Sequence, residues 1–89
     1  MPKYICYHTL PPGQRFSKEQ LSKFSESAQH DPKVRGYRSF SNLSEGKLVC
    51  IMEAPDRETL AAWFEGRGLP VDDITQLEME GEAGYIKAA

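Results

Sequence analysis

Two side chains near the start of the chain have the type and spacing of a metal-binding pair. Cys6 and His8 lie in a segment rich in aromatic and β-branched residues, which predicts a strand over Tyr4 to Leu10. Residues i and i+2 of a strand project from one face, with Cα atoms roughly 6.5–7 Å apart. A thiolate and an imidazole at that spacing suit a borderline-soft cation such as nickel, zinc or copper.

Glu53 is the third candidate ligand, near the end of a strand predicted over Lys47 to Ala54. If this strand presents Glu53 to the side that Cys6 and His8 occupy, the carboxylate supplies an oxygen ligand. We expect that side to be the sheet face without helices. The alternative is structural: Cys6 is a small buried hydrophobe, His8 a hydrogen-bonded residue at the strand end, and Glu53 a solvated or capping carboxylate.

Strand aromatics provide a second candidate site, for a small apolar ligand. The candidates are Tyr4 and Tyr37, with Tyr7 and Phe40 beside them in the sequence pattern. The alternative is that these aromatic side chains simply pack in the core. Cys50 is assigned to the core, because Leu48 and Met52 share its face of the strand.

Several catalytic and binding classes lack their sequence signature. There is no glycine-rich phosphate loop, and no serine has the context of a nucleophile. His30, beside Asp31 and Pro32, suits a partner of a helix dipole better than a base. Pro2 would become a tautomerase-like amine only if Met1 were removed. A net charge of -2, with scattered Lys and Arg, argues against a nucleic-acid partner.

Length and composition predict a single domain over residues 1–89. No run of about 18 apolar residues occurs, so we expect no membrane partner. The first residues lack the charged and apolar regions of a secretory signal. The two cysteines lack zinc-finger spacing, and we expect them to be reduced. The expected location is the cytoplasm.

The first half of the chain predicts a strand, a helix and a second strand. Ser17 fits a helix N-cap, and Gln20 completes a capping box with it. The helix should end by His30–Asp31, because Pro32 disfavours helical geometry in the residue before it. The strand that follows, Val34 to Ser41, forms a hairpin with the strand from Lys47 through a polar loop.

The second half repeats the pattern with a helix and a last strand. Asp56 is the expected N-cap of the helix, and Gly66 and Gly68 are the candidates for its left-handed C-terminal residue. The last strand is predicted over Ile74 to Glu80. The order β-α-β-β-α-β gives an α+β, ferredoxin-like fold: a four-stranded antiparallel sheet with two helices on one face.

The strand from Lys47 is apolar on both sides, which bears on assembly. Leu48, Cys50 and Met52 occupy one side, and Val49 and Ile51 the other. A strand of this kind requires cover on both sheet faces, whereas the helices cover only one. We therefore expect a homodimer that packs sheet against sheet around a barrel-like space.

Two segments resemble a known family. The opening Met1–Tyr4 with His8, and the junction Cys50–Thr59, are similar to a family of short, mostly uncharacterised ferredoxin-like proteins that includes nickel-binding members. The resemblance implies a dimeric α+β barrel and, in some members, a metal bound by side chains. The chain departs from the family pattern where an acid is common at the position of Cys6. It also departs where histidines are common on the second helix, at Trp63, Phe64 and Arg67.

Three hypotheses of function follow. The first, favoured by the resemblance, is a non-catalytic protein that binds a metal or small ligand, with nickel or zinc at His8, Cys6 and Glu53. The second is an enzyme of the dimeric α+β barrel kind, a cofactor-poor monooxygenase or isomerase that acts on a small apolar substrate. The third is an interaction module that only forms its dimer.

Overall fold

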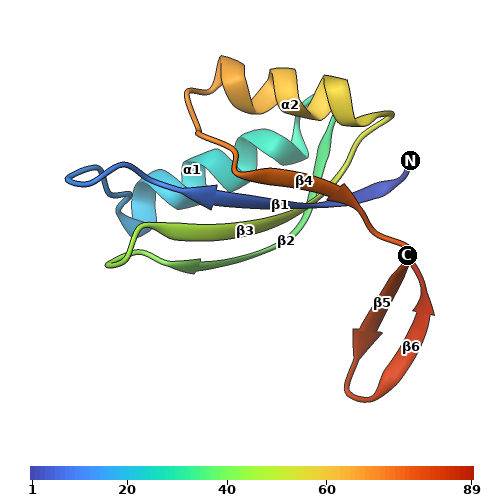
Figure 1. Cartoon of the computed structure of the whole chain (residues 1–89). Coiled ribbons are helices and arrows are strands. Elements are labelled where there is room, and N and C mark those ends of the chain that lie inside the picture. The colour runs from blue at the N-terminus through green and yellow to red at the C-terminus, as the bar shows by residue number, and fades with distance from the viewer.

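A four-stranded antiparallel sheet with two helices on one face forms the body of the protein (Figure 1). The structure is a computed structural model that describes all 89 residues. Its elements are β1 (Lys3–Thr9), α1 (Lys18–Gln29), β2 (Arg35–Asn42), β3 (Lys47–Glu53), α2 (Arg57–Gly66) and β4 (Asp73–Gln76). The strand order is β2-β3-β1-β4, with every neighbouring pair antiparallel. The predicted α+β, ferredoxin-like topology is confirmed.

The first helix begins and ends where its sequence predicts. Ser17 Oγ accepts from the Gln20 amide at 3.1 Å, and the Gln20 side chain accepts from the Ser17 amide at 2.9 Å. This reciprocal pair is the expected capping box. After Gln29 the chain turns, and the Asp31 carboxylate accepts from the amides of Lys33 and Val34.

The second helix is also capped as predicted. Asp56 Oδ1 accepts from the Thr59 amide at 2.7 Å. Gly66 remains within α2, whereas Gly68, with φ +70°, takes the left-handed conformation that ends such helices. Neither helix is long and apolar enough to cross a membrane.

The sheet has one face that the helices cover, which we call the closed face. Buried strand residues alternate along β1 and β3 and meet α1 and α2. The strand residues of this face are Tyr4, Cys6, His8, Leu48, Cys50, Met52 and Ile74. Leu60 and Phe64 of α2 and Ala28 of α1 complete the core from the helix layer. The assignment of Cys50 to the core is confirmed.

The opposite sheet face has no helix over it, and we call it the open face. Its apolar residues are Ile5, Tyr7, Phe40, Val49 and Ile51. Ile5, Val49 and Ile51 are half-buried, but Tyr7 is 42% and Phe40 54% exposed. The strand register places Tyr7, Val49 and Phe40 in one row across three strands. The residues of this row form a continuous apolar surface in contact with solvent.

The predicted last strand, Ile74 to Glu80, is wrong in its second half. The strand β4 ends at Gln76, and the last bond to β1 runs from the Leu77 amide to the Lys3 carbonyl at 2.8 Å. A longer β4 would have no partner strand, because β1 begins at Lys3, and the carbonyl of Pro2 before it faces β3, where it accepts from the Ala54 amide at 3.2 Å. The chain instead leaves the sheet, so the antiparallel ladder ends where its partner strand begins.

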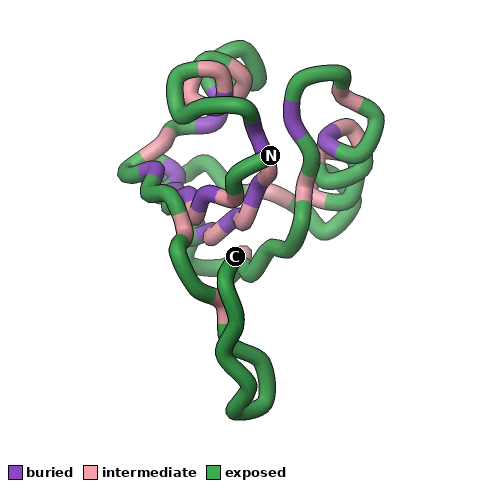
Figure 2. Tube along the Cα trace, turned by 90° about the vertical axis from the view of Figure 1, so that its right-hand side faces the viewer, coloured by how far each residue is buried: buried purple, intermediate pink, exposed green.

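Residues 79–88 form a separate hairpin, which we call the arm. Its strands are β5 (Met79–Glu82) and β6 (Tyr85–Ala88), joined at Ala83 and Gly84. Both turn residues have positive φ, +50° and +83°, as expected for a two-residue turn between antiparallel strands. Figures 1 and 2 show the arm projecting away from the body on the side opposite the helices.

Candidate functional site

The predicted ligands lie on two different faces of the sheet. Cys6 and His8 share one face, as expected, but it is the closed face, where they are 0% and 2% exposed. Glu53 pairs with Lys3 and therefore lies on the open side. The expectation that Cys6 and His8 point to the helix-free side is wrong. In the register, Cys6 is opposite Cys50 and His8 is opposite Leu48, so both follow the apolar residues of β3 under the helices.

His8 has one ring nitrogen in a hydrogen bond and one without a partner. Nδ1 lies 2.8 Å from the carbonyl oxygen of Pro70, in the segment between α2 and β4. The carbonyl can only accept, so Nδ1 carries the hydrogen and donates it. Nε2 is buried and contacts no hydrogen-bonding group. The ring is packed edge-on against Phe64, with ring centroids 4.6 Å apart.

The protonation state of His8 follows from its burial. Loss of solvent lowers the pKa of the imidazole, against smaller opposing effects of the Pro70 carbonyl and the charge of Asp72. The ring is therefore neutral near pH 7, and Nε2 carries a lone pair. Buried polar atoms without a partner are uncommon in folded proteins. A histidine that donates Nδ1–H to a backbone carbonyl and presents Nε2 has the arrangement usual for metal ligands.

The two thiols lie beside each other on the closed face. Cys6 and Cys50 are direct partners across β1 and β3, and both are buried and free of a disulfide. Burial raises the pKa of Cys6 to about 12, with the neighbouring Cys50 adding to the shift, and that of Cys50 to about 11. Both are therefore protonated thiols at neutral pH. A metal would have to displace a proton from either sulfur to bind it.

The candidate ligands do not converge on one point. No group of three or more His, Cys, Asp or Glu side chains is arranged to hold a metal ion. His8 offers one oriented nitrogen, Cys6 lies two residues along the same face, and Glu53 is across the sheet from both. The chain thus provides one nitrogen that is oriented for metal binding, Nε2 of His8, and one sulfur near it, that of Cys6.

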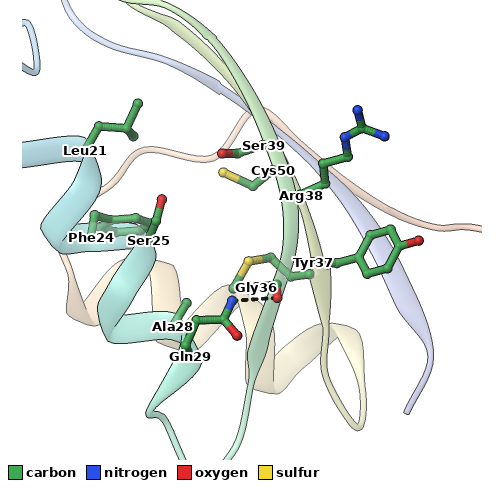
Figure 3. Close-up of a pocket in the computed structure, with 11 residues that line it drawn as sticks. Leu21, Phe24, Ser25, Ala28, Gln29, Gly36, Tyr37, Arg38, Ser39 and Cys50 are labelled. Atoms are coloured by element: carbon green, nitrogen blue, oxygen red, sulfur yellow. Dashed lines mark hydrogen bonds between the residues drawn. The ribbon is translucent and has the colours of Figure 1, made fainter. Parts of the chain in front are cut away.

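A cavity of about 160 Å³ lies between α1 and the edge strand β2 (Figure 3). Leu21 and Phe24 line it from the helix, and Cys50 and Ser39 point into it from the sheet. At one end, the Gln29 side chain donates to the Gly36 carbonyl at 2.7 Å. The lining is mainly apolar and its one titratable side chain on the cavity side, Cys50, is a thiol with a raised pKa.

Tyr37 points to the open side because of an irregularity in β2. The register between β2 and β3 shifts between Gly36 and Arg38, which indicates a β-bulge at Tyr37. Tyr37 and Arg38 therefore both point away from α1 (Figure 3). Tyr4, the other predicted ligand-binding tyrosine, is in the core, 5% exposed. The two tyrosines are thus on opposite sides of the sheet.

A groove of about 520 Å³ separates the open face from the arm. At its root, Glu80 accepts from Lys3 Nζ at 2.9 Å and from the Tyr37 hydroxyl at 2.9 Å. These bonds raise the pKa of Lys3 and lower the pKa of Glu80. Both groups are therefore charged at neutral pH and paired with each other, so neither is suited to transfer a proton.

Sequence reasoning missed this Lys3–Glu80–Tyr37 cluster. The predicted strand from Ile74 to Glu80 places Glu80 at the end of a regular strand of the sheet, whereas Glu80 lies in the hairpin strand β5. The signal was available in the dipeptide Ala83-Gly84, which precedes the strand-favouring residues Tyr85 and Ile86. A short turn at that place predicts a terminal hairpin.

Comparison with known proteins gives a family. No curated protein and no solved structure matches the chain significantly. A family model described as "Nickel responsive protein SCO4226-like" matches residues 4–77, which run from the second residue of β1 past the end of β4 and exclude the arm. Because this match covers most of the sequence, the chain belongs to the family of nickel-responsive SCO4226-like proteins.

Proposed function

We propose that this protein is a non-catalytic binding protein for a late transition metal ion, nickel first, with His8 as the anchoring ligand. The observation that carries the proposal is the buried, neutral imidazole with Nδ1 fixed on Pro70 and Nε2 without a partner. The family supports nickel as the ion to test. An imidazole nitrogen is a good ligand for nickel, zinc and copper.

Cys6 is the best second ligand in the proposal. Its side chain lies on the closed face beside that of His8, and only Tyr7 separates the two residues in β1. Thiolate and imidazole together favour late transition metals over magnesium or calcium. The residues fit such an ion in chemistry, but they do not form a complete site as folded. Glu53, on the other side of the sheet, is the weakest of the three candidates.

We further propose that the protein forms a homodimer through the open face. Tyr7 and Phe40 are exposed there, next to half-buried Val49, Ile5 and Ile51. The helices cannot cover this surface, because they lie on the other side of the sheet. If two such faces packed together, each would bury apolar surface. Burial of apolar surface lowers the free energy by roughly 25 cal/mol per Å².

Titration calorimetry of untagged, reduced protein with Ni²⁺ tests the metal proposal. We expect wild type to bind and His8→Ala to lose at least about tenfold in affinity, equal to about 1.4 kcal/mol. His30→Ala is the matched control, since it removes the other histidine, which is exposed at the end of α1. Equal affinity of wild type and His8→Ala would remove His8 from the site, and failure of wild type to bind Ni²⁺ or Zn²⁺ would overturn the proposal.

The same titration over a pH series tests Cys6. A metal ion that binds the Cys6 sulfur must displace the thiol proton. Burial raises the pKa of this thiol to about 12, so the thiol is protonated throughout this pH series. Affinity should then rise steadily between about pH 6.5 and 9. Binding through the neutral imidazole alone would give affinity that is nearly constant over this range. Cys6→Ser should abolish the rise, whereas Cys50→Ser, next to it on β3, should not.

A further inference from the structure

The cavity between α1 and β2 remains open because the residues that meet there are small. At one end, Gly36 lies against the helix: an added Cβ would be 3.5 Å from the Ala28 Cβ and 4.0 Å from the Met52 Sδ. Farther along β2, the residue that faces α1 is Ser39, opposite Cys50 in the register. Its short side chain leaves a space of about 160 Å³ between the helix and the strand (Figure 3).

The lining of this cavity brings together one aromatic ring and two sulfur atoms. Phe24 lines the cavity from α1, and Cys50 and Met52 line it from β3. Burial raises the pKa of the Cys50 thiol to about 11, so both sulfur groups are uncharged near neutral pH. Sulfur atoms and aromatic side chains both make favourable contacts with an aromatic ring. An aromatic molecule therefore gains more from this lining than an aliphatic molecule of the same size.

The groups that can form hydrogen bonds with a ligand lie on the exposed side of the cavity. Ser25 and Ser39 both line it and are exposed, and each hydroxyl can donate and accept a hydrogen bond. Arg38 is the one charged residue of the lining, and its side chain points away from α1 (Figure 3). Because no charged group faces the space, the ligand should be neutral and should have a hydroxyl group at the mouth.

The volume sets the size of the ligand. An apolar cavity of about 150 Å³ is large enough for benzene, and this one measures about 160 Å³. We propose that the cavity binds a neutral phenol with a single aromatic ring. The ring lies between Phe24 and the two sulfur atoms, and the hydroxyl group lies beside Ser25 and Ser39. Neither His8 nor Cys6 lines the cavity, so this site goes beyond the proposed metal binding and does not depend on it.

The methyl groups of the three methionines report binding in the wild-type protein. Met52 is 4% exposed and lines the cavity, whereas Met1 and Met79 are 64% and 61% exposed and lie elsewhere. In NMR spectra of full-length, reduced protein with ¹³C-labelled methionine methyl groups, phenol should shift the Met52 signal saturably and leave the other two in place. No saturable shift of Met52, or equal shifts of all three signals, would overturn the proposal.

Cyclohexanol separates an aromatic site from a merely apolar one. It has as many heavy atoms as phenol and the same hydroxyl group, and we expect it to bind at least about threefold more weakly. Met52→Leu keeps the volume of the side chain and removes the sulfur. It should weaken phenol binding roughly two- to tenfold and leave cyclohexanol binding unchanged. Equal affinity of the wild type for both compounds, or equal losses in Met52→Leu, would overturn the assignment to an aromatic ligand.

Two leucine substitutions on β2 test the position of the site. Ser39→Leu places a larger side chain in the cavity and should weaken phenol binding at least about tenfold. Ser41→Leu is the matched control, because Ser41 is exposed, lies two residues along the same strand opposite Leu48, and does not line the cavity. Circular dichroism checks that both variants fold. Unchanged binding in Ser39→Leu, or the same loss in both variants, would overturn the placement of the phenol in this cavity.

Discussion

The two faces of the central sheet differ in what their side chains can do. On the closed face, His8, Cys6 and Cys50 have chemically versatile groups but are buried under α1 and α2. On the open face, Tyr7 and Phe40 have aromatic side chains that are poor metal ligands, but these side chains are exposed to solvent. One face therefore holds the candidate ligands and the other the candidate interface, although neighbouring residues of the same strands supply both.

This separation has a consequence for any metal response. A partner subunit on the open face cannot supply ligands to His8, because the sheet lies between them. The remaining ligands would have to come from the chain's own closed face or from water admitted to it. Pro70, which fixes the ring, belongs to the segment after α2. This segment holds Nδ1 of the ring, and Phe64 packs edge-on against it, with ring centroids 4.6 Å apart.

The largest expected effects come from placing the same charge on either face of β3. Met52 is 4% exposed beneath the helices, whereas its neighbour Ile51 is half-buried on the open face. Met52→Lys buries an unpaired charge and should cost several kcal/mol, enough to unfold a marginally stable domain. Ile51→Lys should leave the monomer folded, because lysine can extend its amine to water, but it should abolish the dimer.

Circular dichroism and sedimentation velocity distinguish these outcomes. We expect Met52→Lys to lose its folding transition and Ile51→Lys to keep it while sedimenting as a monomer. If Ile51→Lys remained a dimer at micromolar concentration, the open face would not be the interface. If Met52→Lys folded normally, the closed face would be less tightly packed than its burial indicates.

A smaller effect is expected from the titration of His8. Burial lowers the pKa of the folded imidazole below its unfolded value of about 6.5. At a pH between the folded and the unfolded pKa of His8, the unfolded chain binds more protons than the folded chain. The free energy of unfolding therefore decreases as the pH falls from about 6.5 towards the folded pKa. The limiting slope for one proton is about 1.4 kcal/mol per pH unit. Urea unfolding of wild type between pH 5 and 8 measures this slope.

His8→Leu should flatten that slope. Saturating Ni²⁺, if it binds at Nε2, should steepen the dependence, because protons then compete with the ion. An unchanged slope in His8→Leu would show that His8 is protonated equally in the folded and unfolded chain. The neutral buried imidazole, and the metal proposal built on it, would then be lost.

The sequence predicted the body well because its signals are local. Ser17 with Gln20, and Asp56 before its helix, mark helix starts through bonds within four residues. The alternation along β3 likewise fixes which residues share a face. The direction of that face was not predictable, because it depends on which side the two crossovers place the helices. Cys6 and His8 were therefore correctly paired with each other but assigned to the wrong side.

The arm and the bulge escaped prediction for a related reason. The end of β4 coincides with the start of β1, at the other end of the chain, and the orientation of Tyr37 depends on a register shift against β3. Such effects arise only when distant strands pair. The family match, which ends at residue 77, gives no information about the arm either.

The smallest expected effect concerns the helix layer that closes one face. Ser17→Ala removes the acceptor for the Gln20 amide and one half of the capping box, and should lower the free energy of unfolding by about 0.5–2 kcal/mol. Ser22→Ala, an exposed change inside α1, is the control and should cost nothing, because alanine has the higher helix propensity. Thermal unfolding of both variants measures the difference. Because the cap acts on the closed side alone, the dimer dissociation constant should not change in either variant. A weaker dimer in Ser17→Ala would mean that the two faces are coupled through the sheet.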